Sequence, residues 1–202
     1  MEITDILIDE IEIIGNILVL KEESGFDNQT QTNSVFGEKW TKVDNQGVVD
    51  NSIDFQKRWY LDLYGFSSED DLKTYLQNKR IILDAGCGLG YKAAWFAELA
   101  PECIIIGMDF SDAAYHAANN YKHISNLYFI KGDIADSGIT PGSIDYVSCD
   151  QVIHHTEDPE KTFTHLTSLL SKDGEFHIEK TKYHADGYDR DTNTIFEYDG
   201  DW

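Results

Sequence analysis

One stretch of ten residues, from Ile81 to Gly90, limits the fold of this chain more than any other. It reads IILDAGCGLG, in which three apolar residues and an acid precede glycines at alternate positions. The pattern predicts a buried strand and a tight turn, and residues 91–100 follow as a helix. Glycine has no Cβ, so the turn lets polar groups of a ligand lie against bare backbone at a helix N-terminus. The stretch therefore predicts a site for a nucleotide-type cofactor.

Strands and helices alternate beyond this turn. Five strands are expected, at residues 81–84, 103–108, 127–131, 144–149 and 175–179. Such alternation predicts a parallel sheet with helices on both faces. We expect an α/β fold, a Rossmann-like, doubly wound sheet of strand order 3-2-1-4-5 in a three-layer αβα arrangement. Residues 194–198 are a candidate antiparallel edge strand that folds back on strand five through a turn at 186–191.

The chain divides into three parts. Residues 1–50 hold a small β-hairpin around Gly15-Asn16, a polar linker, and the aromatic segment from Phe36 to Trp40. That segment is either a hydrophobic anchor or part of a lid over a substrate pocket. Residues 51–180 form the main domain, and residues 181–202 form an acidic tail or hairpin.

Composition and charge exclude several classes of protein. The net charge of −21 and the pI of about 4.4 repel phosphate backbones, so no nucleic-acid partner is expected. Cys87, Cys103 and Cys149 lack paired spacing, so neither a metal site nor a disulfide framework is indicated. No signal peptide and no apolar run of about 18 residues is present, so we expect a cytoplasmic protein without a membrane span. The oligomeric state cannot be inferred.

An acid stands at or just after the end of four successive predicted strands. These acids are Asp84, Asp109, Asp133 and Asp150. Ligands of doubly wound sheets bind outside the carboxyl ends of the strands, where the strand order reverses. We therefore expect the four carboxylates to lie around one ligand.

Residues 81–180 resemble the class I methyltransferases that use S-adenosyl-L-methionine. The resemblance rests on LDAGCGLG at 83–90, on Asp109, on Gly132-Asp133-Ile134, and on DYVSCDQVIHH at 145–155. It implies that Asp109 accepts hydrogen bonds from the ribose hydroxyls and that Asp133 meets the adenine amino group. The implied cofactor-binding residues are Asp84, Gly86, Cys87, Gly88, Gly90, Asp109, Phe110, Asp133, Ile134, Cys149 and Asp150.

The resemblance implies methyl transfer to a small-molecule acceptor through O, N or C. Acids suit this cofactor, because its sulfonium and ammonium are cations and its vicinal diol wants a bidentate acceptor. His154 and His155 follow the fourth strand, and histidine titrates near neutral pH. Either is a candidate catalytic base, and the sequence does not distinguish them.

Three alternatives stay open. A nicotinamide-dependent oxidoreductase fits G-x-G-x-x-A from Gly88 to Ala93 with Asp109 about 20 residues on, but Asp84 and Asp133 favour the methyltransferase. A nucleic-acid methyltransferase would carry Asn/Asp-Pro-Pro-Tyr/Phe after the fourth strand, which this chain lacks. A catalytically impaired cofactor-binding remnant or fusion fragment is the third.

The two ends of the chain carry weaker resemblances. Residues 182–202 resemble the opening of nuclease domains of the very-short-patch-repair and homing type, with Asp186 and Glu197 at the positions of the metal-binding acids. The Phe36 to Trp40 segment is similar to one that follows a zinc ribbon in some sugar and natural-product methyltransferases. The ribbon's cysteines are absent from this chain, so no metal is predicted.

Overall fold

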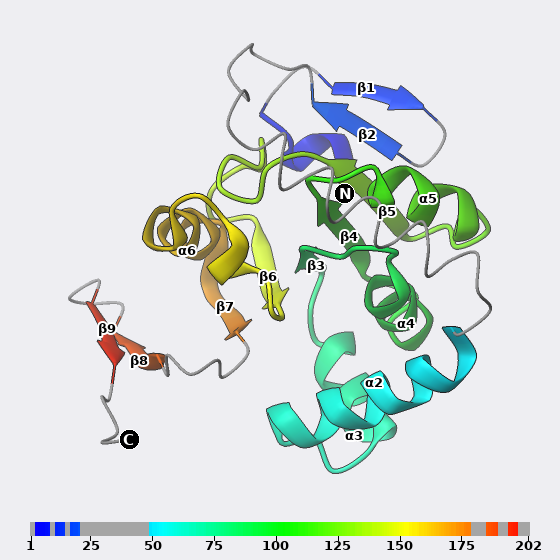
Figure 1. Ribbon diagram of the computed structural model, residues 1–202, viewed down its shortest axis with the longest axis horizontal. Coiled ribbons are helices and arrows are strands. Elements are labelled where there is room, and N and C mark those ends of the chain that lie inside the picture. The colour runs from blue at the N-terminus through cyan, green and yellow to red at the C-terminus, as the bar shows by residue number, and fades with distance from the viewer. Residues whose placement is uncertain are drawn as a thin grey trace.

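A seven-stranded sheet in the order β1-β2-β5-β4-β3-β6-β7 forms the centre of the molecule (Figure 1). The computed structural model describes residues 3–8, 11–14, 17–20, 49–178, 185–189 and 194–197. The strands of the sheet are β1 (Ile11–Ile14), β2 (Ile17–Leu20), β3 (Ile81–Ala85), β4 (Ile104–Asp109), β5 (Leu127–Lys131), β6 (Ile144–Cys149) and β7 (Leu170–Ile178). Within it β1 and β2 pair antiparallel, and every other neighbouring pair is parallel.

The predicted strand order is correct in part. The five strands β5-β4-β3-β6-β7 correspond to the predicted order 3-2-1-4-5. The N-terminal hairpin, however, is not a separate extension, because β2 pairs in parallel with β5 and places Ile17 opposite Phe129. The antiparallel edge strand is therefore β1, at the edge opposite to the one predicted.

The tail does not extend the sheet. Strands β8 (Ala185–Asp189) and β9 (Thr194–Glu197) pair antiparallel with each other as a separate two-stranded sheet. The prediction that residues 194–198 pair with strand five, through a turn at 186–191, is wrong, because β8 is the nearer partner across a short connection. The resemblance of the tail to nuclease domains stays a prediction, and the segment from Phe36 to Trp40 lies outside the described residues.

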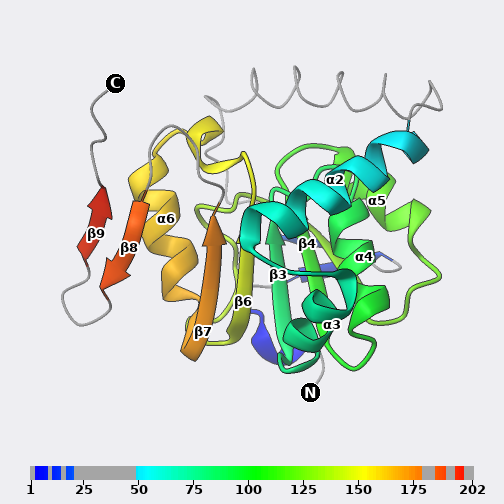
Figure 2. The same cartoon turned by 90° about the horizontal axis from the view of Figure 1, so that it is seen from below.

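The helices cover the two faces of the sheet unequally (Figure 2). One face packs against α2 (Val49–Tyr64), α3 (Glu69–Gln77), α4 (Tyr91–Leu99) and α5 (Ala113–Asn120). Phe96, Phe129 and Tyr146 are buried in that layer. The other face packs against α6 (Pro159–Ser168) and the 3₁₀ turn η1 (Ile3–Ile6), with Leu166 and Ile106 between them. Three layers result, as predicted.

Local sequence signals set several boundaries. Ser68 caps α3, since its hydroxyl accepts a hydrogen bond from the Asp71 amide at 3.2 Å. Asp158 caps α6 in the same way, and Pro159 takes the first helical position. One boundary differs from expectation: β7 begins at Leu170, five residues before the predicted start of that strand at residue 175.

The path of the chain creates a crevice at one edge of the sheet. From β3 the chain adds β4 and then β5 on one side, and it returns to add β6 on the other side of β3. The carboxyl ends of β3 and β6 therefore lie side by side, and the loops that follow these two strands lead away from each other. This is the position at which doubly wound sheets bind their ligands.

Gly90 is required by both its backbone and its surroundings. It has φ of +81°, and a Cβ there would lie 2.7 Å from the Phe129 ring and 2.9 Å from the Ala117 Cβ. Gly142 has a similar φ of +75°, but a Cβ there would meet no atom within 4 Å. The two glycines thus separate backbone strain from steric collision.

We predict that Gly142→Ala lowers the free energy of unfolding by about 1–2 kcal/mol, from the left-handed backbone alone. Gly90→Ala should cost about 1–3 kcal/mol more, because it also overpacks the core. Urea denaturation of the two variants measures the difference. Equal losses would show that Phe129 and Ala117 relax without cost.

Candidate functional site

A cavity of about 590 Å³ opens at the carboxyl ends of the strands. It is lined by ten of the predicted site residues: Asp84, Gly86, Cys87, Gly88, Asp109, Phe110, Asp133, Ile134, Asp150 and His155. The other three, Gly90, Cys149 and His154, do not line it. The structure therefore brings together the four strand-end acids, and the cavity falls within the usual size of small-molecule sites.

The glycine loop forms one side of the cavity. The amides of Gly86 and Cys87 both donate to the carbonyl of Met108, at 2.8 and 2.9 Å, which ties the loop to β4. A Cβ on Gly86 would lie 2.3 Å from a Val152 methyl, and its φ is +77°. The loop thus approaches the segment after β6 as closely as a backbone without side chains permits.

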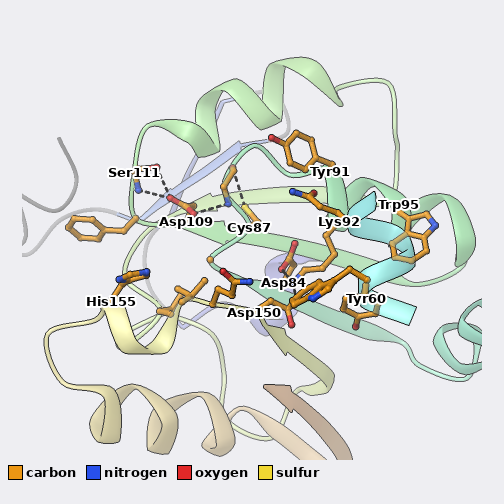
Figure 3. Close-up of a pocket in the computed structure, with 18 of the residues that line it drawn as sticks. Tyr60, Asp84, Cys87, Tyr91, Lys92, Trp95, Asp109, Ser111, Asp150 and His155 are labelled. Carbon is orange, nitrogen blue, oxygen red and sulfur yellow. Dashed lines mark hydrogen bonds and ion pairs between the residues drawn. The ribbon is translucent and has the colours of Figure 1, made fainter. Parts of the chain in front are cut away.

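Asp109 is held in place at the end of β4 (Figure 3). One carboxylate oxygen accepts the Gly88 amide at 2.8 Å, and the other accepts the amide and the hydroxyl of Ser111 at 2.9 and 2.6 Å. A carboxylate has about four acceptor positions, so Asp109 keeps capacity for a donor from a ligand. It joins the glycine loop to the start of α5.

Asp133 and Ile134, after β5, form another side of the cavity. One carboxylate oxygen of Asp133 accepts the Ala135 amide at 2.8 Å, which fixes the turn after β5. Ile134 is buried beneath this turn. An acid and an apolar side chain at neighbouring positions suit a flat heterocycle that carries a donor at its edge.

A cluster of three charges lies at the crevice between β3 and β6. Lys92, from the first turn of α4, forms ion pairs with Asp84 at 3.0 Å and with Asp150. The Asp84 side chain is fully buried, and the Lys92 ammonium is its one polar partner among the described residues. A buried carboxylate held only by an ion pair has unused acceptor capacity.

Burial and the neighbouring charges act on the pKa values of Asp84 and Lys92 in opposite directions. Burial raises the pKa of Asp84 to about 6, although the charge of Lys92 works against the shift. Burial alone would lower the pKa of Lys92, but the charges of Asp150 and Asp84 outweigh it and raise that pKa. Counted by formal charge, the cluster has two carboxylates against one ammonium, which leaves one negative charge in excess.

Helix α2 forms a wall of the cavity and is anchored by two tyrosines. The Tyr64 hydroxyl donates to Asp150, and the hydroxyls of Tyr60 and Tyr146 hydrogen bond to each other. The Tyr146 hydroxyl in turn lies 3.0 Å from Nδ1 of His177, within hydrogen-bond distance. Ile53, Phe55 and Trp59 of the same helix also line the cavity, which gives it an apolar side.

The two candidate histidines are in different positions. Both belong to the 3₁₀ turn η2 (Ile153–His155) and are exposed, with ring centroids 3.9 Å apart. Of the two histidines, only His155 lines the cavity.

The two cysteines predicted at the site are not reactive thiolates. Burial raises the pKa of the Cys87 and Cys149 thiols, so neither is a thiolate at neutral pH.

Sequence reasoning missed Lys92 and the tyrosines of α2. A signal for Lys92 was present: it is a cation in the first turn of a helix, where the helix dipole disfavours positive charge. A lysine at that position requires acidic partners, and Asp84 stands eight residues before it. No comparable signal marks Tyr60 or Tyr64, which reach the site from a separate helix.

Two kinds of feature are absent from the described part of the chain. No group of three or more His, Cys, Asp or Glu side chains there is arranged to hold a metal ion. No helix within the same residues has both the length and the apolar character needed to cross a membrane.

Comparisons with known proteins bear on the family to which the chain is related. Residues 76–195 match the model of a family described as "Methyltransferase domain". The tRNA U34 carboxymethyltransferase of Campylobacter fetus is 32% identical over 117 residues, 56% of this chain and 41% of that protein. The malonyl-[acyl-carrier protein] O-methyltransferase of Legionella pneumophila is 30% identical over 96 residues, 47% of this chain and 34% of that protein. The chain thus spans less than half the length of these two relatives.

One solved structure supports the fold. The PH0226 protein from Pyrococcus horikoshii superposes with a TM-score of 0.50 at 25% identity, over 60% of this chain and 57% of that protein.

The raised pKa of Asp84 predicts an unusual pH dependence of stability. Because the folded state binds this proton more tightly than the unfolded state, the contribution of Asp84 is most favourable below pH 4 and is lost as pH rises through about 6. Without ligand, the free energy of unfolding of Asp84→Asn should therefore exceed that of wild type by roughly 1–3 kcal/mol at pH 7.5. The advantage should shrink as pH falls to 4.5.

Asp54→Asn is the matched control, since it removes one carboxylate from an exposed position on α2. Subtracting its effect cancels the general relief of negative charge. Chemical denaturation at the two pH values measures both variants. Lower stability of Asp84→Asn at pH 7.5 would mean that the ionised carboxylate stabilises the fold.

Proposed function

Because this chain belongs to the methyltransferase-domain family, we propose that it binds S-adenosylmethionine in the described cavity and transfers its methyl group to a small-molecule acceptor. The observation that carries the proposal is the fully buried Asp84 carboxylate, whose one polar partner among the described residues is the Lys92 ammonium, at the floor of a cavity bordered by a glycine loop. A cationic ligand that also donates hydrogen bonds satisfies such a group. The ammonium of S-adenosylmethionine meets both requirements, and its sulfonium adds a second positive charge.

The polar groups of the cavity match the parts of this cofactor in order. Asp84, Lys92 and Asp150 offer charges to its amino-acid end, and Asp109 offers acceptor capacity to its ribose diol. Asp133 and Ile134 suit its adenine. The bound cofactor supplies an electrophilic methyl group, and the protein's part is to hold an acceptor in line with it and to exclude water.

The walls of the cavity indicate the class of acceptor. Four acids line it against two lysines, Lys57 and Lys92, which leaves a formal charge of −2. Such a site disfavours an anionic acceptor. Phe55 and Trp59 add apolar surface, so we assign a neutral or cationic small molecule with an apolar part. The net charge of −21 weighs against a nucleic acid.

The retained alternative is a domain that binds the cofactor without turnover. The matches cover 41% and 34% of the two curated relatives, so the activity of those whole proteins is not assigned to this chain. A screen with radiolabelled methyl donor and a panel of neutral and amine acceptors separates the two: transfer to any acceptor excludes the binding-only alternative. Binding of NADH in place of the methyl donor would instead favour an oxidoreductase.

Calorimetric titration with S-adenosylhomocysteine tests the cofactor assignment. Asp109→Asn removes the charge from the ribose acceptor and should weaken binding roughly 10–100-fold, the effect of losing a charged hydrogen bond. Asp112→Asn is the matched control, because Asp112 is exposed, pairs with Lys131 at 2.6 Å, and does not line the cavity. It should change the affinity less than twofold. The assignment fails if wild type does not bind or if both variants bind like wild type.

His155 is the histidine that we propose to act on the acceptor, because it lines the cavity. With an acceptor from the screen, His155→Gln should lower kcat about 10²-fold or more if it is a general base. His154→Gln changes a neighbouring exposed ring outside the cavity and should leave kcat unchanged. Unchanged turnover in His155→Gln would mean that methyl transfer proceeds by positioning alone.

A further inference from the structure

The two lysines that line the cavity have different surroundings. Lys57, on α2, lies 3.8 Å from Glu69 and 5.2 Å above the centre of the Trp95 ring. Lys92 points into the charged cluster, where Asp84 and Asp150 hold its ammonium (Figure 3). Its side chain keeps 21% of its exposure, so it lies at the surface of the cavity floor.

The two acids share this lysine unequally. Asp150 also accepts hydrogen bonds from the hydroxyls of Tyr64 and Ser148. Asp84 has the ion pair with Lys92 at 3.0 Å as its one polar contact among the described residues. Asp84 is therefore the member of the cluster that gains most from a ligand's donors.

An amino-acid end fits this asymmetry. Its ammonium carries three donors and compensates the excess negative charge of the cluster at Asp84. Its carboxylate lies a few bonds from that ammonium and then needs a cation nearby. Lys92 is adjacent to Asp84, and the N-terminus of α4, from which it extends, favours an anion as well.

We infer that Lys92 recognises the carboxylate of the cofactor's amino-acid end by an exchange of ion pairs. In the ligand-free protein the Lys92 ammonium compensates Asp84. When the cofactor binds, its ammonium takes that place at Asp84, and Lys92 keeps Asp150 and turns to the cofactor's carboxylate. This role rests on the proposed binding of S-adenosylmethionine, and it assigns Lys92 to selection between cofactors that have and lack the carboxylate.

A pair of ligands that differ only in the carboxylate tests the exchange. S-adenosylhomocysteine carries it, and the 5′-(3-aminopropyl)thio derivative of adenosine is the same thioether without it. Wild type should prefer the first roughly tenfold or more, the effect of one charged hydrogen-bonded contact. Lys92→Met should reduce the preference to about twofold or less. Both ligands bind the same variant, so a partly unfolded sample does not alter the ratio.

Lys57→Met is the control, because it removes a lysine that lines the same cavity and pairs outside the cluster. It should keep the wild-type preference. A wild-type preference retained in Lys92→Met overturns the inference, and so does its loss in Lys57→Met alone. If Lys92→Met does not fold, the wild type still decides, since equal affinity for the two ligands contradicts any carboxylate recognition. Failure of wild type to bind either ligand would instead reject the proposed cofactor.

Discussion

The ion pairs of Lys92 with Asp84 and Asp150 are the interaction on which the rest of the site depends. They join the first turn of α4 to the ends of β3 and β6, the two strands that flank the crevice. Opposite charges attract strongly in a buried site, and an unpaired charge there is costly. The Lys92 ammonium therefore requires an acid partner, and the cluster ties the start of α4 to the carboxyl ends of β3 and β6, where a ligand binds.

Much of the fold could be predicted because its signals are local. The apolar run before Gly86, the alternation of strands with helices, and the caps at Ser68 and Asp158 each lie within a few residues of what they determine. The prediction of an S-adenosylmethionine-dependent methyltransferase domain is confirmed at the level of family and fold. The pairing of β2 with β5 could not be foreseen in this way, because it joins residues more than 100 positions apart and no local pattern selects β5 as the partner.

The site residues, too, separate into those that local sequence signals predict and those that only the tertiary structure places. The four acids were predicted because each follows a strand, and parallel strands bring their ends to one edge. Tyr60 and Tyr64 were not, because they belong to a helix that precedes β3 and is positioned only by tertiary contacts. His154 and His155 are neighbours in one short turn, so only three-dimensional placement distinguishes the ring that faces the cavity from the one that does not.

Asp150 serves the floor and the wall of the cavity together, since it receives both the Lys92 ammonium and the Tyr64 hydroxyl. A substitution of Tyr64 changes what Asp150 contacts, and a substitution of Asp150 changes what Tyr64 contacts. The effects of the two substitutions will therefore not add. Divergence toward a new acceptor is easiest at the apolar residues of α2 that line the cavity, such as Phe55. Residues 64 and 150 are instead expected to change together among relatives of this chain, because the hydroxyl of one donates to the carboxylate of the other.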